Sequence, residues 1–168
     1  MNIDDMNTII DFLEQQYQMK PKRKPKVPYR KPDSIRELER LHFEQKRMRN
    51  PDMPFPVKTK FRDDSANGLT RCITAWLQLN GYFAGRVNTT GTYNQKLGRY
   101  IHSGSKRGMA DITAIINGRH VSIEVKYGKD RICPEQLKVK KEIEAAGGVY
   151  IIASSFDGFI EQIINLKQ

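Results

Sequence analysis

Residues 108–126 read GMADITAIINGRHVSIEVK, and this stretch decides the fold. Two runs rich in β-branched residues flank Asn117-Gly118, a pair that favours a two-residue hairpin turn. Counted back from that turn along both strands, Asp111 lies opposite Glu124. Successive side chains point to opposite faces of a strand, and directly opposed residues have Cβ atoms about 4.5–5.5 Å apart. We therefore expect one apolar face and one polar face, with two carboxylates side by side on the polar face.

Lys126 lies two residues after Glu124 and should face the same way. Two opposed carboxylates repel each other, and a divalent cation held by their oxygens would remove that cost. The lysine could then orient a water molecule or stabilise an oxyanion. An ordinary exposed hairpin face with mixed charges would contain the same residues, so the stretch alone leaves both interpretations open.

The composition favours a polyanionic partner such as nucleic acid. The chain has 168 residues, with 29 Lys or Arg against 19 Asp or Glu and a formal net charge of +10; solubility alone would also account for such a charge. The two cysteines and three histidines show no spacing typical of a zinc site or a disulfide framework. No run approaches the ~20 apolar residues of a membrane span, and no signal-peptide pattern is present. We expect a soluble, intracellular (cytoplasmic) protein without a membrane partner.

We place a domain boundary at about residue 60. Residues 1–60 form an N-terminal extension, in which helices are predicted over residues 3–19 and 33–49. Between them, residues 20–32 are basic and proline-rich, which suits either a flexible arm that contacts phosphates or a solvated linker. The apolar stripe of the first helix permits a homodimer without requiring one.

The second predicted helix begins with Ser34 and Glu37 at the spacing of a capping box. Residues 89–108 show only weak signals and read as a loop. Basic and aromatic side chains alternate there, which suits either a strand of nucleic acid or a solvated surface loop.

Residues 61–168 predict a small α/β sandwich, a mixed sheet flanked by helices. Strand, helix and strand follow one another after residue 119, so the last strand should run parallel to residues 119–127 through a right-handed crossover. Besides the hairpin, the predicted elements are helices over residues 65–80, 134–146 and 157–166 and strands over residues 82–88 and 149–153.

With these elements placed, the chain resembles the PD-(D/E)XK nuclease superfamily and, within it, the VRR-NUC (virus-type replication-repair nuclease) branch. The shared motif is an acid at the start of one strand and acid-x-lysine on the next. Here these are Asp111 and Glu124-Val125-Lys126, with Ala110 in place of the motif's proline. Further matches, over about residues 65–157, are Gly108, Pro134-Glu135-Gln136, Gly147–Ile152 and Gly81–Asn88.

The resemblance implies a restriction-endonuclease-like sandwich with an αβββαβ core and metal-dependent hydrolysis of phosphodiester bonds in DNA. Asp111, Glu124 and the Val125 carbonyl would bind Mg²⁺ or Mn²⁺, which polarises the phosphate and activates water. Lys126 would position that water or stabilise charge. Gln136 would assist from the following helix, unless it is only a polar residue at a helix start. The candidate phosphate contacts are Arg86, Lys106, Arg107 and Lys129.

One departure from the family pattern affects the expected function. Relatives usually carry a further glutamate near the start of the first helix, where this chain has residues 67–69 (Asn-Gly-Leu). Asp63 or Asp64 would replace it if the helix began earlier, although both also suit ordinary acids at a helix N-terminus. Two hypotheses therefore stay open: a metal-dependent DNA nuclease, including one specific for branched or junction DNA, and a non-catalytic nucleic-acid-binding protein on a nuclease fold.

Overall fold

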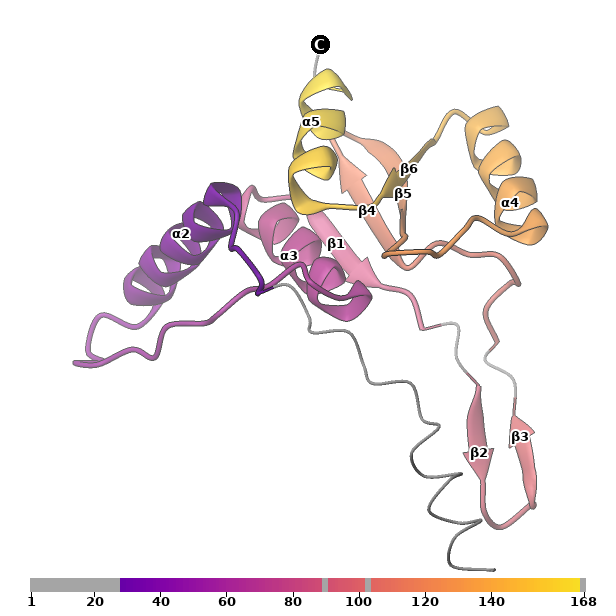
Figure 1. Cartoon of the computed structure of the whole chain (residues 1–168), viewed down its shortest axis with the longest axis horizontal. Helices are drawn as coiled ribbons and strands as arrows, with labels where there is room; N and C mark the ends of the chain where they lie inside the picture. Colours follow the sequence, from indigo (N-terminus) through magenta and orange to yellow (C-terminus); the bar gives the residue numbers. More distant parts are fainter. Residues whose placement is uncertain (1–27, 89–90, 102–103, 167–168) are drawn as a thin grey trace, which may run out of the picture. The chain divides into compact units, whose positions relative to one another are not determined.

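The computed structural model describes residues 28–88, 91–101 and 104–166 of the chain (Figure 1). The chain divides into two compact units, Met1–Arg30 and Lys31–Gln168. The helix predicted over residues 3–19 and most of the basic segment at residues 20–32 lie outside the described residues. Within the described part, no helix is long and apolar enough to cross a membrane.

A four-stranded mixed sheet forms the centre of the second unit. Its strands are β1 (Phe83–Arg86), β4 (Ile112–Ile116), β5 (Arg119–Val125) and β6 (Val149–Ala153), in the order β1-β4-β5-β6. The first two pairings are antiparallel, whereas β5 and β6 are parallel, as the βαβ order predicts. The expected α/β class with a mixed sheet is confirmed.

The β4–β5 hairpin has the predicted register. Asn117 and Gly118 form the turn with φ values of 50° and 79°. Both lie in the left-handed region that glycine and asparagine tolerate best, which gives the turn the twist that neighbouring strands need. The pairs include Ile116 with Arg119 and Ile112 with Ile123. This register places Asp111, just before β4, opposite Glu124.

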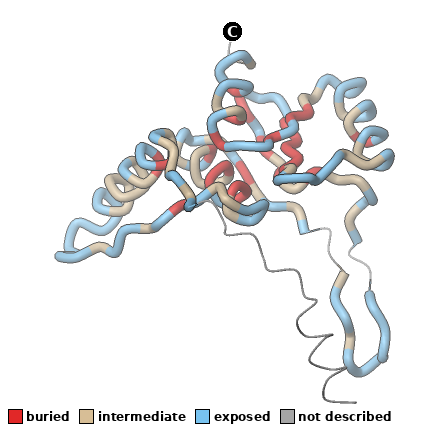
Figure 2. Tube along the Cα trace, viewed as in Figure 1, coloured by how far each residue is buried: buried red, intermediate tan, exposed pale blue. Residues whose placement is uncertain are grey.

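Helices cover both faces of the sheet. On one face, β-strand side chains pack with α3 (Ala66–Leu79) and α5 (Phe156–Leu166) into the main core, which includes Ile73, Ile123 and Phe159. The opposite face carries a smaller cluster in which Val139 of α4 (Pro134–Ala145) meets Tyr150 of β6. The buried segments in Figure 2 run through the sheet and the inner sides of these helices. The three-layer arrangement follows from alternation along each strand.

Helix α2 (Asp33–Arg49) belongs to the same core as the sheet. Ile35 and Leu38 are 0% and 1% exposed and join the main core. The division in the chain therefore comes after Arg30, and not near residue 60 as the sequence suggested.

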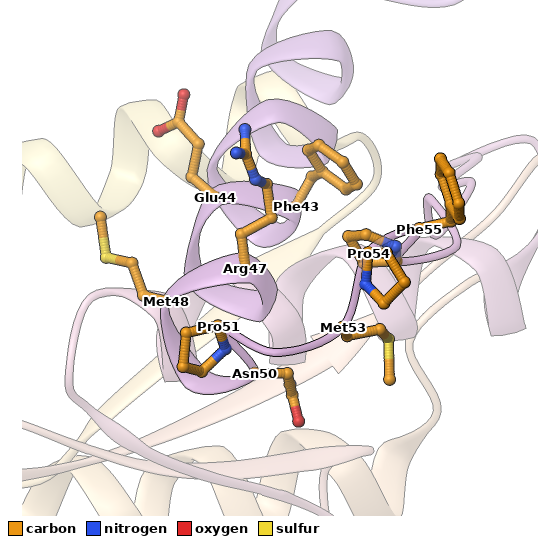
Figure 3. A pocket seen from close by; sticks show the side chains of 10 residues that line it. Phe43, Glu44, Arg47, Met48, Asn50, Pro51, Met53, Pro54 and Phe55 are labelled. Atoms are coloured by element: carbon orange, nitrogen blue, oxygen red, sulfur yellow. The ribbon is translucent and has the colours of Figure 1, made fainter.

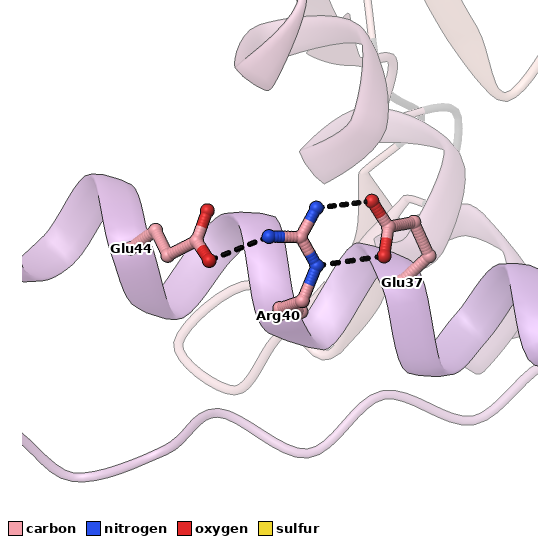
Figure 4. Close-up of polar contacts among 3 residues, drawn as sticks. All are labelled: Glu37, Arg40 and Glu44. Carbon is pink, nitrogen blue, oxygen red and sulfur yellow. Dashed lines mark hydrogen bonds and ion pairs between the residues drawn. The ribbon is translucent and has the colours of Figure 1, made fainter.

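The outer side of α2 carries ion pairs rather than core residues. Arg40 pairs with Glu37 at 2.6 Å and with Glu44 at 2.5 Å (Figure 4). Exposed pairs of this kind contribute only about 0.3–0.5 kcal/mol each. The predicted capping box is wrong: Pro32 occupies the N-cap, and the Ser34 hydroxyl is buried without a hydrogen-bond partner among the described residues.

The predicted loop over residues 89–108 contains regular structure. Strands β2 (Thr92–Asn94) and β3 (Arg99–Ile101) form a separate two-stranded antiparallel sheet between β1 and β4 in the chain. The prediction failed because each strand has only three residues, too few for alternation to stand out.

Candidate metal centre

The carboxylate of Asp111 is fixed between two strands at one end of the sheet. Its Oδ2 accepts a hydrogen bond from the Val125 N–H of β5 at 3.0 Å. Its main-chain carbonyl accepts another from the Val87 N–H, just beyond β1, at 2.8 Å. Backbone groups on both sides therefore hold this residue in place, as a metal ligand requires.

Glu124 is a buried carboxylate with one occupied oxygen and one unpartnered oxygen. The residue is 3% exposed. Its Oε1 accepts a hydrogen bond from Gln136 Nε2 at 2.6 Å and lies 2.9 Å from Lys126 Nζ. Its Oε2 is buried and has no hydrogen-bond partner among the described residues. Such an orphaned acceptor is uncommon in folded proteins and indicates a missing partner.

Electrostatics at Glu124 agree with its burial. Loss of hydration raises its pKa above the ordinary 4.5; the nearby charge of Asp111 raises it further, and the ammonium of Lys126 opposes the shift. The interpretation as an exposed hairpin face is wrong here, because Ser122 on the same face is only 1% exposed. The polar face is covered, and its two acids lie close enough to influence each other.

Lys126 follows β5 and remains on this covered face. Its side chain is 16% exposed, and its main-chain N–H donates to the Ala153 carbonyl at the end of β6, at 2.9 Å. The structure therefore holds the lysine backbone while its ammonium reaches Glu124. A cation in this position can meet an anion that approaches from solvent.

Gln136 takes both roles that the sequence left open. It lies in the first turn of α4, where its Oε1 accepts a hydrogen bond from the Cys133 N–H at 3.0 Å and so caps the helix. Its Nε2 is the donor to Glu124. One amide group therefore joins the start of α4 to the buried carboxylate.

Gly108 allows α4 to approach the loop that precedes Asp111. Its φ is +81°, and a Cβ at this position would lie 2.4 Å from the Glu135 carbonyl oxygen and 2.9 Å from the Gln136 nitrogen. No side chain fits there without moving the backbone of the first turn of α4. Gly108 is therefore required by the close packing of the first turn of α4 against this loop.

Tyr150 is a residue of this site that the sequence analysis did not single out. It is 6% exposed, pairs with Ser122 in the sheet register, and its hydroxyl is buried without a hydrogen-bond partner among the described residues. Burial and then the charges of Glu124 and Asp111 raise its pKa, which places the hydroxyl beside both acids. Alternation along β6 could have found it, since Ile151 faces the main core.

The four candidate phosphate contacts differ in their surroundings. Arg86 donates to Asn67 Oδ1 at 2.9 Å, and Lys106 forms an ion pair with Glu142 of α4. Arg107 and Lys129 are exposed. The structure thus ties two of these cations to protein groups and leaves two at the surface.

Asp63 and Asp64 hold other parts of the fold. Asp63 Oδ2 accepts a hydrogen bond from the Phe156 N–H at 3.5 Å, at the start of α5. Asp64 accepts one from Arg62 Nε at 2.9 Å. Across the described residues, no group of three or more His, Cys, Asp and Glu side chains could hold a metal ion. Neither Asp63 nor Asp64 therefore supplies a third acid to the site of Asp111 and Glu124.

The residues that are present still suit a small hard cation. Such ions prefer oxygen ligands and keep several waters, so two carboxylates and a main-chain carbonyl are enough protein ligands. The unpartnered Glu124 Oε2 is the oxygen that such an ion would satisfy. The Asp111 carboxylate and the Val125 carbonyl would supply the other two.

A cavity elsewhere in the fold is separate from these residues. It has a volume of about 750 Å³ and lies where α2 ends and the chain turns (Figure 3). Its walls are mostly apolar and include Phe43, Met48, Met53, Pro54 and Phe55. Glu44 also lines it, but neither Asp111 nor Glu124 does.

Comparison with known proteins identifies no family for this chain. No protein-family model matches it, and no curated protein matches it significantly.

Proposed function

We propose that the chain is a metal-dependent DNA nuclease that hydrolyses phosphodiester bonds. The observation that carries the proposal is the buried Glu124 carboxylate. One of its oxygens is held by Gln136 and Lys126, and the other is unpartnered close to Asp111. A buried, oriented acid beside a second acid and a lysine is the arrangement expected for a divalent-cation site that meets a phosphate.

Each residue has a distinct role in this proposal. Asp111, Glu124 and the Val125 carbonyl hold Mg²⁺ or Mn²⁺, which when bound polarises the scissile phosphate and lowers the pKa of water. Lys126 positions the attacking water or donates to the charged phosphate. Gln136 keeps Glu124 oriented through its 2.6 Å hydrogen bond.

The same residues support membership of the PD-(D/E)XK superfamily, with a VRR-NUC-like, restriction-endonuclease-like core. The strand order and the α3-β1-β4-β5-α4-β6 succession agree with an αβββαβ core. The proposal extends to branched or junction DNA as substrate, by analogy with that family.

DNA is the proposed partner because the chain carries a net charge of +10. Arg86, Lys106, Arg107 and Lys129 are the proposed phosphate contacts. We also propose that the protein acts inside the cell, where its two free cysteines stay reduced. A homodimer would let two such sites cut two strands, and light scattering on the purified protein would test it.

The decisive experiment measures cleavage of labelled duplex, flap, single-stranded and four-way-junction DNA with Mg²⁺ or Mn²⁺. Asp111→Asn and Glu124→Gln should each lower the rate by at least about a hundredfold, because both remove a ligand charge. Glu161→Gln, an exposed carboxylate on α5, is the matched control and should cleave like the parent. Chelation with EDTA should abolish cleavage. Full activity in the Asp111 and Glu124 variants would refute the assignment.

A second function is supported by the absence, within the described part of the chain, of a third acid beside Asp111 and Glu124. In that case the protein binds nucleic acid on a nuclease fold without cutting it. It would bind DNA with strong salt dependence and would cleave none of the substrates in either metal. Metal-dependent turnover that is lost in Asp111→Asn would exclude this function.

A further inference from the structure

The hairpin formed by β2 and β3 is built differently from the rest of the fold. Its strands pair Thr92 with Ile101, Tyr93 with Tyr100 and Asn94 with Arg99, and they form a sheet of their own. A two-stranded hairpin without a packed face is marginally stable in water. Packing into a hydrophobic core therefore does not explain the side chains that this hairpin exposes.

Those side chains are large and apolar or aromatic. Tyr93 is 52% exposed and Tyr100 is 69% exposed, and their ring centroids lie 5.5 Å apart at 58°. Leu97 at the tip and Ile101 are 57% and 44% exposed. Clustered exposed groups of this kind mark an interaction surface. Because the tyrosines are direct cross-strand partners, they present one continuous aromatic face.

The charge around this face identifies the partner. Residues 87–110, which comprise the hairpin and its two connections, contain four Lys or Arg and no Asp or Glu, and Lys96 and Arg99 lie in the hairpin itself. A partner that combines repeated negative charge with planar apolar faces is a nucleic acid with unpaired bases. Aromatic side chains stack on such bases whatever their sequence, and cations hold the phosphates beside them.

The connections of the hairpin begin and end beside the candidate metal centre. The chain leaves β1 after Arg86 and returns to Asp111, and the Val87 N–H bonds to the Asp111 carbonyl at 2.8 Å. The Ser105 hydroxyl donates to the Asn88 carbonyl at 2.9 Å, so the two stems meet again near their base. The chain that leaves the hairpin thus leads directly to Asp111, so DNA bound by the hairpin would be connected to the candidate metal centre through this segment.

We propose that the β2–β3 hairpin is an arm that binds unpaired bases of DNA through Tyr93 and Tyr100, with Lys96 and Arg99 on the neighbouring phosphates. This inference deepens the proposed nuclease function, on which it rests for its substrate class. It assigns the preference for single-stranded or branched DNA to the hairpin, and leaves bond cleavage to Asp111 and Glu124.

The test measures binding by fluorescence anisotropy, using the full chain with Asp111→Asn so that no DNA is cut. The aromatic variant Tyr93→Ala/Tyr100→Ala should bind single-stranded and flap DNA at least about thirtyfold more weakly, which is the lower limit expected for the loss of two stacked bases. Its affinity for blunt duplex should stay within about twofold. Tyr93→Phe/Tyr100→Phe keeps both rings and should restore binding.

Two charge variants separate stacking from general electrostatics. Lys96→Gln/Arg99→Gln should weaken binding to every DNA and lower the salt slope for single strands by about 1.4, the value expected for two lost phosphate contacts. Arg47→Gln/Arg49→Gln removes two exposed charges from the end of α2 and should leave the affinity for each DNA close to that of the parent.

The inference would be overturned by unchanged affinity of the alanine variant, or by an equal loss of affinity on duplex and single strands. Circular dichroism should show unchanged melting of the core, because the hairpin has its own sheet. Cleavage by the chain with Asp111 intact is measured in parallel. Binding that depends on the tyrosines, without any cleavage, would refute the nuclease function but support the binding role of the hairpin. Cleavage at the same rate with and without the tyrosines would support the nuclease function but refute the binding role of the hairpin.

Discussion

Replacing Gly108 with alanine tests how tightly the loop before Asp111 packs on α4. The φ of +81° would force the alanine into the left-handed region, and its Cβ would lie 2.4 Å from the Glu135 carbonyl oxygen. Because both atoms of this contact belong to backbone or are bonded to it, no side-chain rotation can relieve it. The first turn of α4 must move.

The cost can be estimated from three contributions. The left-handed conformation costs about 1–2 kcal/mol in a residue with a Cβ, and lower unfolded-state entropy returns about 0.4–1 kcal/mol. Overpacking adds about 1–3 kcal/mol. We therefore expect Gly108→Ala to lower the free energy of unfolding by about 3 kcal/mol, within a range of about 1–5 kcal/mol.

Gly147 supplies a matched control at the other end of α4. Its φ is +83°, and a Cβ there would meet nothing within 4 Å. Gly147→Ala should therefore cost only about 1 kcal/mol, from the backbone alone. Urea unfolding of both variants measures the difference, which isolates the contact with α4. The reasoning is refuted if the two variants are equally stable within about 0.5 kcal/mol.

The same substitution should also affect the candidate metal centre. Moving residues 135 and 136 shifts the Gln136 amide, which holds Glu124 at 2.6 Å. At a temperature where both variants are folded, Gly108→Ala should need more metal for half-maximal cleavage than Gly147→Ala. Equal metal requirements would show that the first turn of α4 does not orient Glu124.

Three further predictions concern the buried groups themselves. Gln136→Leu should weaken metal binding or activity about 10–100-fold, because Glu124 loses its donor; metal titration measures this, and an unchanged titration would contradict it. Glu124→Gln should stabilise the metal-free protein at neutral pH. The raised folded-state pKa means that the folded protein holds its proton above pH 4.5, where the unfolded chain has lost it, so wild-type stability falls as pH rises through this window. The gain should vanish below pH 4.5 in urea titrations with EDTA, and a gain that persists there would contradict the prediction. Tyr150→Phe should raise the free energy of unfolding by about 1–3 kcal/mol, because it removes a buried hydroxyl that has no hydrogen-bond partner among the described residues; a loss of stability in urea unfolding would contradict this and show that the hydroxyl is bonded to Glu124.

The hairpin and its register could be predicted because they depend on neighbouring residues. Asn117 and Gly118 tolerate positive φ, and this local preference sets every pairing of β4 with β5. The parallel return of β6 followed from the handedness of a βαβ connection. These features placed Asp111 opposite Glu124 from sequence alone.

The N-terminal boundary and the hairpin at residues 92–101 could not be predicted in the same way. Ile35 and Leu38 look like an ordinary amphipathic stripe, and only the packing of α2 shows that they enter the main core. The strands β2 and β3 are too short to show a period. The first error arises because the contacts that bury α2 join residues far apart in the sequence. The second has a different cause, since β2 and β3 pair locally but are too short for alternation to stand out.

Sequence alone therefore determined which carboxylates face each other, because turn geometry and strand alternation are local. Tertiary structure decided how deeply those carboxylates are buried and which groups surround them. The approach of α4 to Gly108 covers the polar face, buries Glu124 to 3% exposure and supplies the Gln136 donor. Burial raises the pKa of Glu124 and leaves Oε2 without a partner among the described residues. The burial of Glu124 depends on a helix packed across the sheet, because desolvation is set by the atoms that surround a group in space.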